Sequence, residues 1–167
     1  MRPESARTKE HTISEQNSVT VTRTIDAPNE DVFEALTKVE NHERIDGSGF
    51  VRSLDTGDRI TAVGQVFTMN MEGDHMGGEY QTDNHVVGYD KDKLVAWKTA
   101  PAGTEPPGWQ WVWDLNPVDP GHTEVTLTYD WSHVTDKELL KKVSFPLVSA
   151  EQLEESLKNL AALALEK

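Results

Sequence analysis

The chain has 167 residues, about the length of one domain with a substantial core. Its 29 acidic residues outnumber its 16 lysines and arginines, and the net charge of −13 disfavours nucleic acid and anionic membrane surfaces as partners. The absence of cysteine excludes disulfides, thiolate metal sites and cysteine nucleophiles. We expect a cytoplasmic protein, because no stretch resembles a signal peptide and the longest apolar run, "LAALAL", is too short to span a bilayer.

The first strand is expected directly after a polar N-terminal segment. Residues 1–17 are aperiodic and predict a disordered leader, so that residues 18–167 form a single domain. In "SVTVTRTI", Val19, Val21 and Ile25 share one face, which is typical of a half-buried strand. Pro28 suits the first turn of a helix that fades near "ENHERIDGSG". Its apolar stripe is Val32, Phe33, Leu36 and Val39.

A series of strand-like runs follows this helix. They are "FVRSL", "QVFTMNM", "EYQTDNHVVGY", "LVAWKTA", "WQWVWDL" and "TEVTLTYDWS". The segments between them, including "DKDK" and "NPVDPGH", are too short for crossover helices and carry turn residues. The runs therefore predict an antiparallel meander.

The C-terminal segment predicts a long amphipathic helix. Ser149 and Gln152 have the spacing of a capping box, and Val148 and Leu153 that of a hydrophobic staple. Apolar side chains then recur at helical spacing at Leu153, Leu157, Leu160 and Ala164. A shorter helix is expected over "TDKELLKKV".

Three tryptophans occupy every second position of one predicted strand. Trp109, Trp111 and Trp113 therefore point to the same face, which is the apolar side of the sheet and needs the long helix as its cover. Such side chains either fill the core or wall a small-molecule pocket. Phe67, Met69 and Met71 on another strand favour a pocket, because methionine forms adaptable surfaces.

The element order and several local stretches resemble one superfamily. "IDAPNEDVFEAL", "HERIDGSGFV", "KLVAWKTAP" and "TEVTLTYDWS" are similar to the START and birch-pollen-allergen superfamily (SRPBCC), often labelled polyketide cyclase and lipid transport. The resemblance covers nearly all of the chain after the leader. It implies an α+β helix-grip fold, in which a curved antiparallel sheet wraps around the long C-terminal helix and encloses an apolar cavity. It supplies no shared catalytic motif.

The ligand-binding candidates are the inward side chains that would line this cavity. The segment from His42 to Gly49 would lie near one mouth of it. The candidates are Trp109, Trp111, Trp113, Phe67, Met69, Met71, Tyr129 and Leu157, with Leu160 also on the helix.

Specific catalytic and metal motifs are missing from the sequence. The six histidines show no His-Glu-x-x-His or His-x-His spacing, so no metal site is predicted. No Gly-x-Ser-x-Gly elbow or phosphate-binding loop occurs either, and no cofactor is expected.

His42, Asp46 and His85 are the candidate acid-base groups. His42 and Asp46, four residues apart, could share a helix face and form a hydrogen bond. The alternative is that Asp46 turns the chain into "GSG" while His42 lies on the surface. His85 lies in a strand, and a bulge would move it from one face to the other.

Three functions remain open at this point. The favoured one is a non-enzymatic carrier or sensor of a small hydrophobic molecule, lipid-like or polyketide-like. The second is an enzyme of the cyclase or dehydratase type in the same cavity, and the third is a co-chaperone domain that activates a heat-shock ATPase. Two titratable groups converging in the cavity would favour the enzyme, and their absence the carrier. The sequence predicts neither the ligand nor the oligomeric state.

Overall fold

A seven-stranded antiparallel sheet forms the body of the molecule, in the order β1-β7-β6-β5-β4-β3-β2. The computed structural model describes residues 17–166, so the leader expected at residues 1–17 lies outside the described residues apart from Asn17. The strands are β1 (Ser18–Ile25), β2 (Val51–Thr56), β3 (Val66–Gly73), β4 (Gly78–Asp90), β5 (Leu94–Pro101), β6 (Gln110–Asp119) and β7 (His122–Asp130). All six strands from β2 to β7 pair with their sequence neighbours, as the short turns predicted.

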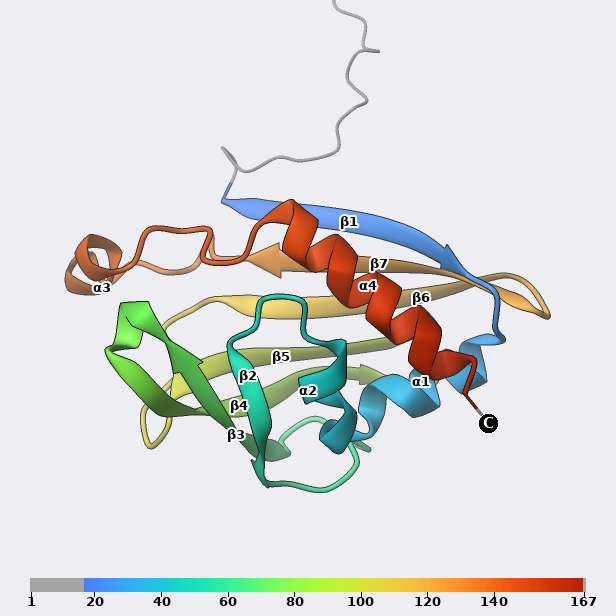
Figure 1. Cartoon of the computed structure of the whole chain (residues 1–167), viewed down its shortest axis with the longest axis horizontal. Helices are drawn as coiled ribbons and strands as arrows, with labels where there is room; N and C mark the ends of the chain where they lie inside the picture. Colours follow the sequence, from blue (N-terminus) through green and yellow to red (C-terminus); the bar gives the residue numbers. More distant parts are fainter. Residues whose placement is uncertain (1–16, 167) are drawn as a thin grey trace, which may run out of the picture.

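Helix α4 (Ala150–Ala164) lies across one face of the curved sheet, and this arrangement confirms the α+β helix-grip fold (Figure 1). The remaining helical elements join or flank the strands. They are α1 (Asn29–Thr37), η3 (Val39–Asn41), α2 (His42–Ile45), η4 (Asp74–Met76) and α3 (Lys137–Lys142).

The N-terminal capping box of α4 is confirmed. The Gln152 amide donates to Ser149 Oγ at 3.1 Å, and the Ser149 amide donates to Gln152 Oε1 at 2.8 Å. Val148 and Leu153 are both buried, as expected for a hydrophobic staple. These contacts fix the start of the helix over the sheet, and its buried side comprises Leu153, Ser156, Leu157, Leu160, Leu163 and Ala164.

Two boundaries differ from the expectation. Pro28 is the N-cap of α1 rather than part of its first turn, and the helix ends at Thr37 before the short η3 and α2. Strand β6 continues through the segment expected to be a turn as far as Asp119. A register shift between Pro117 and Asp119 accommodates the proline, which has no amide to donate.

The loop after α2 approaches α4 closely at Gly47. Its amide donates to Ser156 Oγ at 2.8 Å, and a Cβ at this position would lie 2.9 Å from Glu155 Cβ. We expect Gly47→Ala to lower the free energy of unfolding by about 1–3 kcal/mol, because the added methyl forces loop and helix apart. Gly121→Ala is the control, since only Asp119 Oδ1, at 3.8 Å, lies near its Cβ. Equal urea-unfolding midpoints for the two variants would contradict this.

Candidate functional site

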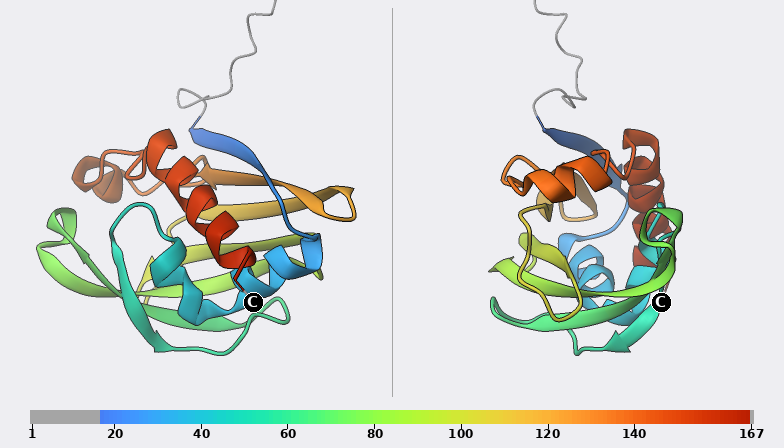
Figure 2. Two further views of the ribbon diagram at one scale, coloured as in Figure 1. Left: turned by 45° about the vertical axis from the view of Figure 1, so that its right-hand side comes forward. Right: turned by 90° about the vertical axis from the view of Figure 1, so that its left-hand side faces the viewer.

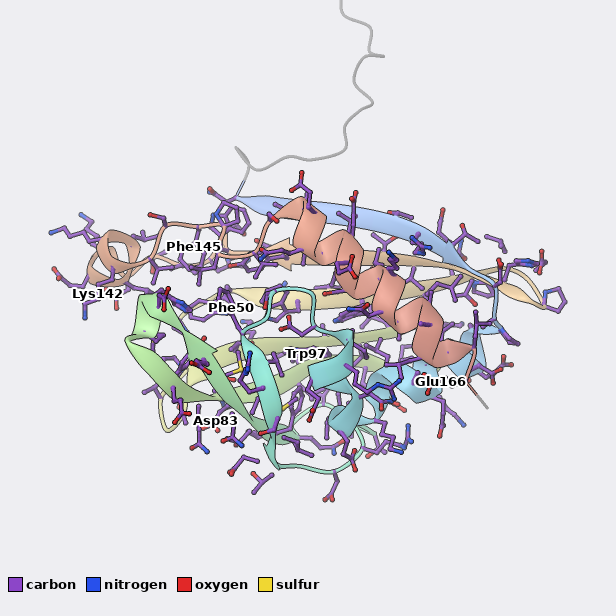
Figure 3. The ribbon with its side chains drawn as sticks, viewed as in Figure 1. Phe50, Asp83, Trp97, Lys142, Phe145 and Glu166 are labelled. Carbon is purple, nitrogen blue, oxygen red and sulfur yellow. The ribbon has the colours of Figure 1, made fainter. Side chains whose placement is uncertain are left out.

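An apolar cavity of about 180 Å³ lies between the sheet and its helical cover. Strands β3 to β7 form its wall, and α2 and α4 cover it. Figure 3 shows Trp97 of β5 near the middle of the molecule and Phe50 nearer the end that carries α3. A cavity of about 150 Å³ can hold benzene. The volume here therefore suits a molecule of one or two rings.

Seven of the eight side chains predicted to bind a ligand line this cavity. They are Trp109, Trp111, Trp113, Phe67, Met69, Met71 and Tyr129. The prediction for Leu157 is wrong, because this side chain is not part of the cavity lining and packs in the core instead. Helix α4 presents Leu153 and Ser156, closer to its N-terminus, to the cavity instead.

The cavity wall is built from aromatic rings in contact. Trp97 and Trp113 stack with centroids 6.3 Å apart, and Trp111 and Tyr129 stack at 4.2 Å with an angle of 9° between their planes. Phe67 meets Trp97 edge-on at 5.5 Å. Sequence reasoning missed Trp97, although it alternates with Val95 and Thr99 on the covered face of β5. The wall therefore presents flat apolar surfaces to whatever enters.

A chain of buried hydrogen bonds crosses this wall. Trp111 Nε1 donates to Thr99 Oγ1 at 3.1 Å, and Thr99 Oγ1 donates to Asn84 Oδ1 at 2.7 Å. Asn84 Nδ2 in turn donates to the Phe67 carbonyl at 3.2 Å and to Thr82 Oγ1 at 3.4 Å. Sequence reasoning missed this group; its only signal was the alternation of Thr82, Asn84 and Val86 on β4. Because these side chains bond mainly to one another, most polar groups of the wall already have a hydrogen-bond partner.

His42 and Asp46 both line the cavity, but they do not form the expected pair. His42 Nε2 lies 2.8 Å from the carbonyl oxygen of Leu36. The Asp46 carboxylate accepts bonds from Ser48 Oγ at 2.7 Å and from the amides of Gly49 and Val51 at 3.0 and 3.1 Å. Asp46 thus turns the chain, as the alternative stated. His42 is buried rather than on the surface, at 7% exposure.

Burial keeps the His42 ring uncharged. It lowers the pKa of His42 to about 4, against the opposing effects of the Leu36 carbonyl and of the charges on Asp46 and Glu40. A carbonyl oxygen only accepts, so the proton of the neutral ring resides on Nε2. Nδ1 therefore carries a free lone pair.

His85 lies outside the cavity, so its assignment as an acid-base group there is wrong. It pairs with Val66 on β3 and Lys98 on β5, whose side chains lie on the uncovered face of the sheet. This strand does contain an irregularity of register, but it falls between Val86 and Gly88, after the histidine. It therefore does not turn His85 inward.

One end of the cavity is framed by η4 and α3, which lie at the same end of the molecule (Figure 2). On the η4 side, Tyr80 Oη lies 3.4 Å from His75 Nε2, and the His75 ring packs on Phe50 at 4.9 Å. Burial, with the nearby charge of Asp46, raises the pKa of Tyr80 to about 12. The phenol is therefore protonated at neutral pH. On the other side Leu139 of α3 lines the opening.

Residues 17–166 contain neither a cluster of metal-binding side chains nor a membrane-spanning helix. No group of three or more histidine, aspartate or glutamate side chains there is placed to hold a metal ion. Within the same range, no helix combines the length and the apolar character that crossing a membrane requires.

The sequence model of one family, described as polyketide cyclase / dehydrase and lipid transport, matches residues 16–164. The chain belongs to this family. Among individual proteins, the chain is 29% identical over 105 residues to an uncharacterized protein of Mycobacterium tuberculosis. That match covers 63% of this chain and 43% of the relative, so the chain spans less than half of the relative's length.

Solved structures share the fold of this family member. A protein from Arthrobacter aurescens superposes with a TM-score of 0.65 at 15% identity, covering 92% of this chain and 88% of that one. A Mycobacterium smegmatis protein gives 0.64 at 18% identity, with coverage of 89% and 91%. The Aha1 dimer structure from Colwellia psychrerythraea gives 0.55 at 20% identity, with coverage of 90% and 98%. At these identities the likeness establishes the fold alone.

Proposed function

We propose that this protein binds a small hydrophobic molecule in the cavity between sheet and α4, as a carrier or sensor. The observation that carries the proposal is a cavity of about 180 Å³ walled by stacked aromatic rings. Exclusion of apolar surface from water drives binding to such a wall. The family description, which includes lipid transport, agrees with this role.

Binding is favoured over catalysis by the state of the titratable groups. An acid-base mechanism needs a proton donor and an acceptor converging on the substrate. Asp46 is engaged by the backbone of its own loop, and His42 bonds the Leu36 carbonyl instead of Asp46. The remaining close pair, His75 and Tyr80, is an exposed contact at the opening and not among the stacked rings. A cyclase or dehydratase is the second candidate, because the neutral His42 ring lines the cavity and could accept a proton.

Binding of a neutral aromatic probe tests the proposal. Titration with 1-aminonaphthalene, a two-ring probe that is uncharged at neutral pH, is expected to quench tryptophan emission with saturation. Trp111→Phe should weaken probe binding about tenfold, since it reshapes the wall and removes the donor to Thr99. Trp131→Phe is the matched control, because Trp131, like Trp111, packs on Tyr129 but does not line the cavity. Failure of the parent protein to bind any apolar probe would overturn the proposal.

A further inference from the structure

His42 places an unused hydrogen-bond acceptor on the cavity. Its Nε2–H donates to the carbonyl oxygen of Leu36, and Nδ1 has no hydrogen-bond partner within residues 17–166. Because His42 lines the cavity and Nδ1 has no partner in that range, this lone pair is the polar group that the ring can offer to a molecule inside the cavity.

The ring that carries this acceptor is held in one orientation. It stacks on Trp97 at 5.0 Å with an angle of 19°, and it meets Phe67 edge-on at 5.2 Å. The hydrogen bond to the Leu36 carbonyl oxygen further restricts rotation of the ring. An acceptor fixed before binding loses little entropy when a ligand arrives, so it can contribute to affinity and selectivity.

The chemistry around Nδ1 restricts the group that it can bind. A neutral imidazole nitrogen needs a donor, and a hydroxyl supplies one without bringing a charge into apolar surroundings. A carboxylate has no proton to donate at neutral pH, and Asp46 nearby on the cavity lining would repel it. The aromatic lining, which includes Trp97 and Trp113, complements an aromatic ligand.

We propose that the cavity selects neutral, planar aromatic molecules bearing a hydroxyl group, and that this hydroxyl donates a hydrogen bond to Nδ1 of His42. The inference rests on the proposed function and adds the ligand class and the residue that recognises it. With room for one or two rings, the cavity matches a bicyclic phenol in size.

Three naphthalene derivatives test this selectivity at pH 7. 2-Naphthol carries the donor, 2-methoxynaphthalene keeps the ring without it, and 2-naphthoate carries a carboxylate. Calorimetric titration should give 2-naphthol the tightest binding, about tenfold tighter than the methyl ether, and 2-naphthoate the weakest. In His42→Phe the ring stack remains and the acceptor is lost, so 2-naphthol and the ether should bind equally. His122→Phe, at the start of β7 and outside the cavity, is the control and should keep the preference.

A measurement on the parent protein does not depend on whether a variant folds. The ¹⁵N resonance of His42 Nδ1 should shift when 2-naphthol binds and stay in place when the ether binds. Equal affinity of the parent protein for both compounds would overturn the ligand class while leaving the proposed function intact. A preference that persists in His42→Phe would overturn the role of His42. Absence of binding by all three compounds and by the neutral probe would overturn the proposed function, and the inference with it.

Discussion

Leu157→Ala is expected to lower the free energy of unfolding by about 2–5 kcal/mol, because a buried leucine in α4 is replaced by a void. Leu157 is 1% exposed and packs in the core beyond the edge of the cavity. The affinity for 1-aminonaphthalene should therefore stay unchanged under conditions in which the variant is folded. Urea denaturation gives the stability, and fluorescence titration at low urea gives the affinity.

Two other leucines of the C-terminal segment complete this test. Leu165→Ala should change stability by less than about 0.5 kcal/mol, since that side chain is 56% exposed. Leu153 is as deeply buried as Leu157 and also lines the cavity, so Leu153→Ala should change both stability and probe affinity. If Leu157→Ala altered the affinity as much as Leu153→Ala, the cavity would extend along α4 beyond Leu153 and Ser156.

The parts of the fold predicted from sequence are those set by local pattern. The alternation of Trp109, Trp111 and Trp113 identified the covered side of β6, because side-chain direction in a strand depends only on parity. The capping box of Ser149 and Gln152 identified the start of α4, because its hydrogen bonds join residues three apart.

The errors concern geometry that local pattern does not determine. Helical periodicity places Leu153 and Leu157 on the same side of α4, but which of them meets the cavity depends on how the helix lies across the sheet. The pairing of His42 with Asp46 assumed a helix through both. Helix α2 ends at Ile45, and Asp46 has the non-helical dihedrals φ −59° and ψ 120°. The partner that His42 does have, Leu36, belongs to another helix, and no spacing rule indicated it.

Lowering the pH from 7 to 4 is expected to remove about 3 kcal/mol of stability through His42. The pKa of His42 is about 4 in the folded protein and 6.5 in the unfolded chain. Between these values the unfolded chain binds a proton on this residue and the folded protein does not. Acidification therefore favours the unfolded state, and this contribution to stability is complete above pH 6.5 and lost as the pH falls to 4.

Other groups also titrate in this range, so the prediction concerns a difference between two proteins. In His42→Phe the titrating group is absent, while Asp46, Glu40 and the remaining acids are retained. Urea denaturation at pH 7, 6, 5 and 4 should show the parent losing stability relative to this variant, most steeply between pH 6 and 4. A difference that stays constant across the four pH values would show that the folded His42 ring takes up a proton as readily as the unfolded one. In the folded protein the Nδ1 lone pair is lost only as the pH falls through about 4. The preference of the parent protein for 2-naphthol over its methyl ether should therefore persist at pH 6 and 5 and decline near pH 4.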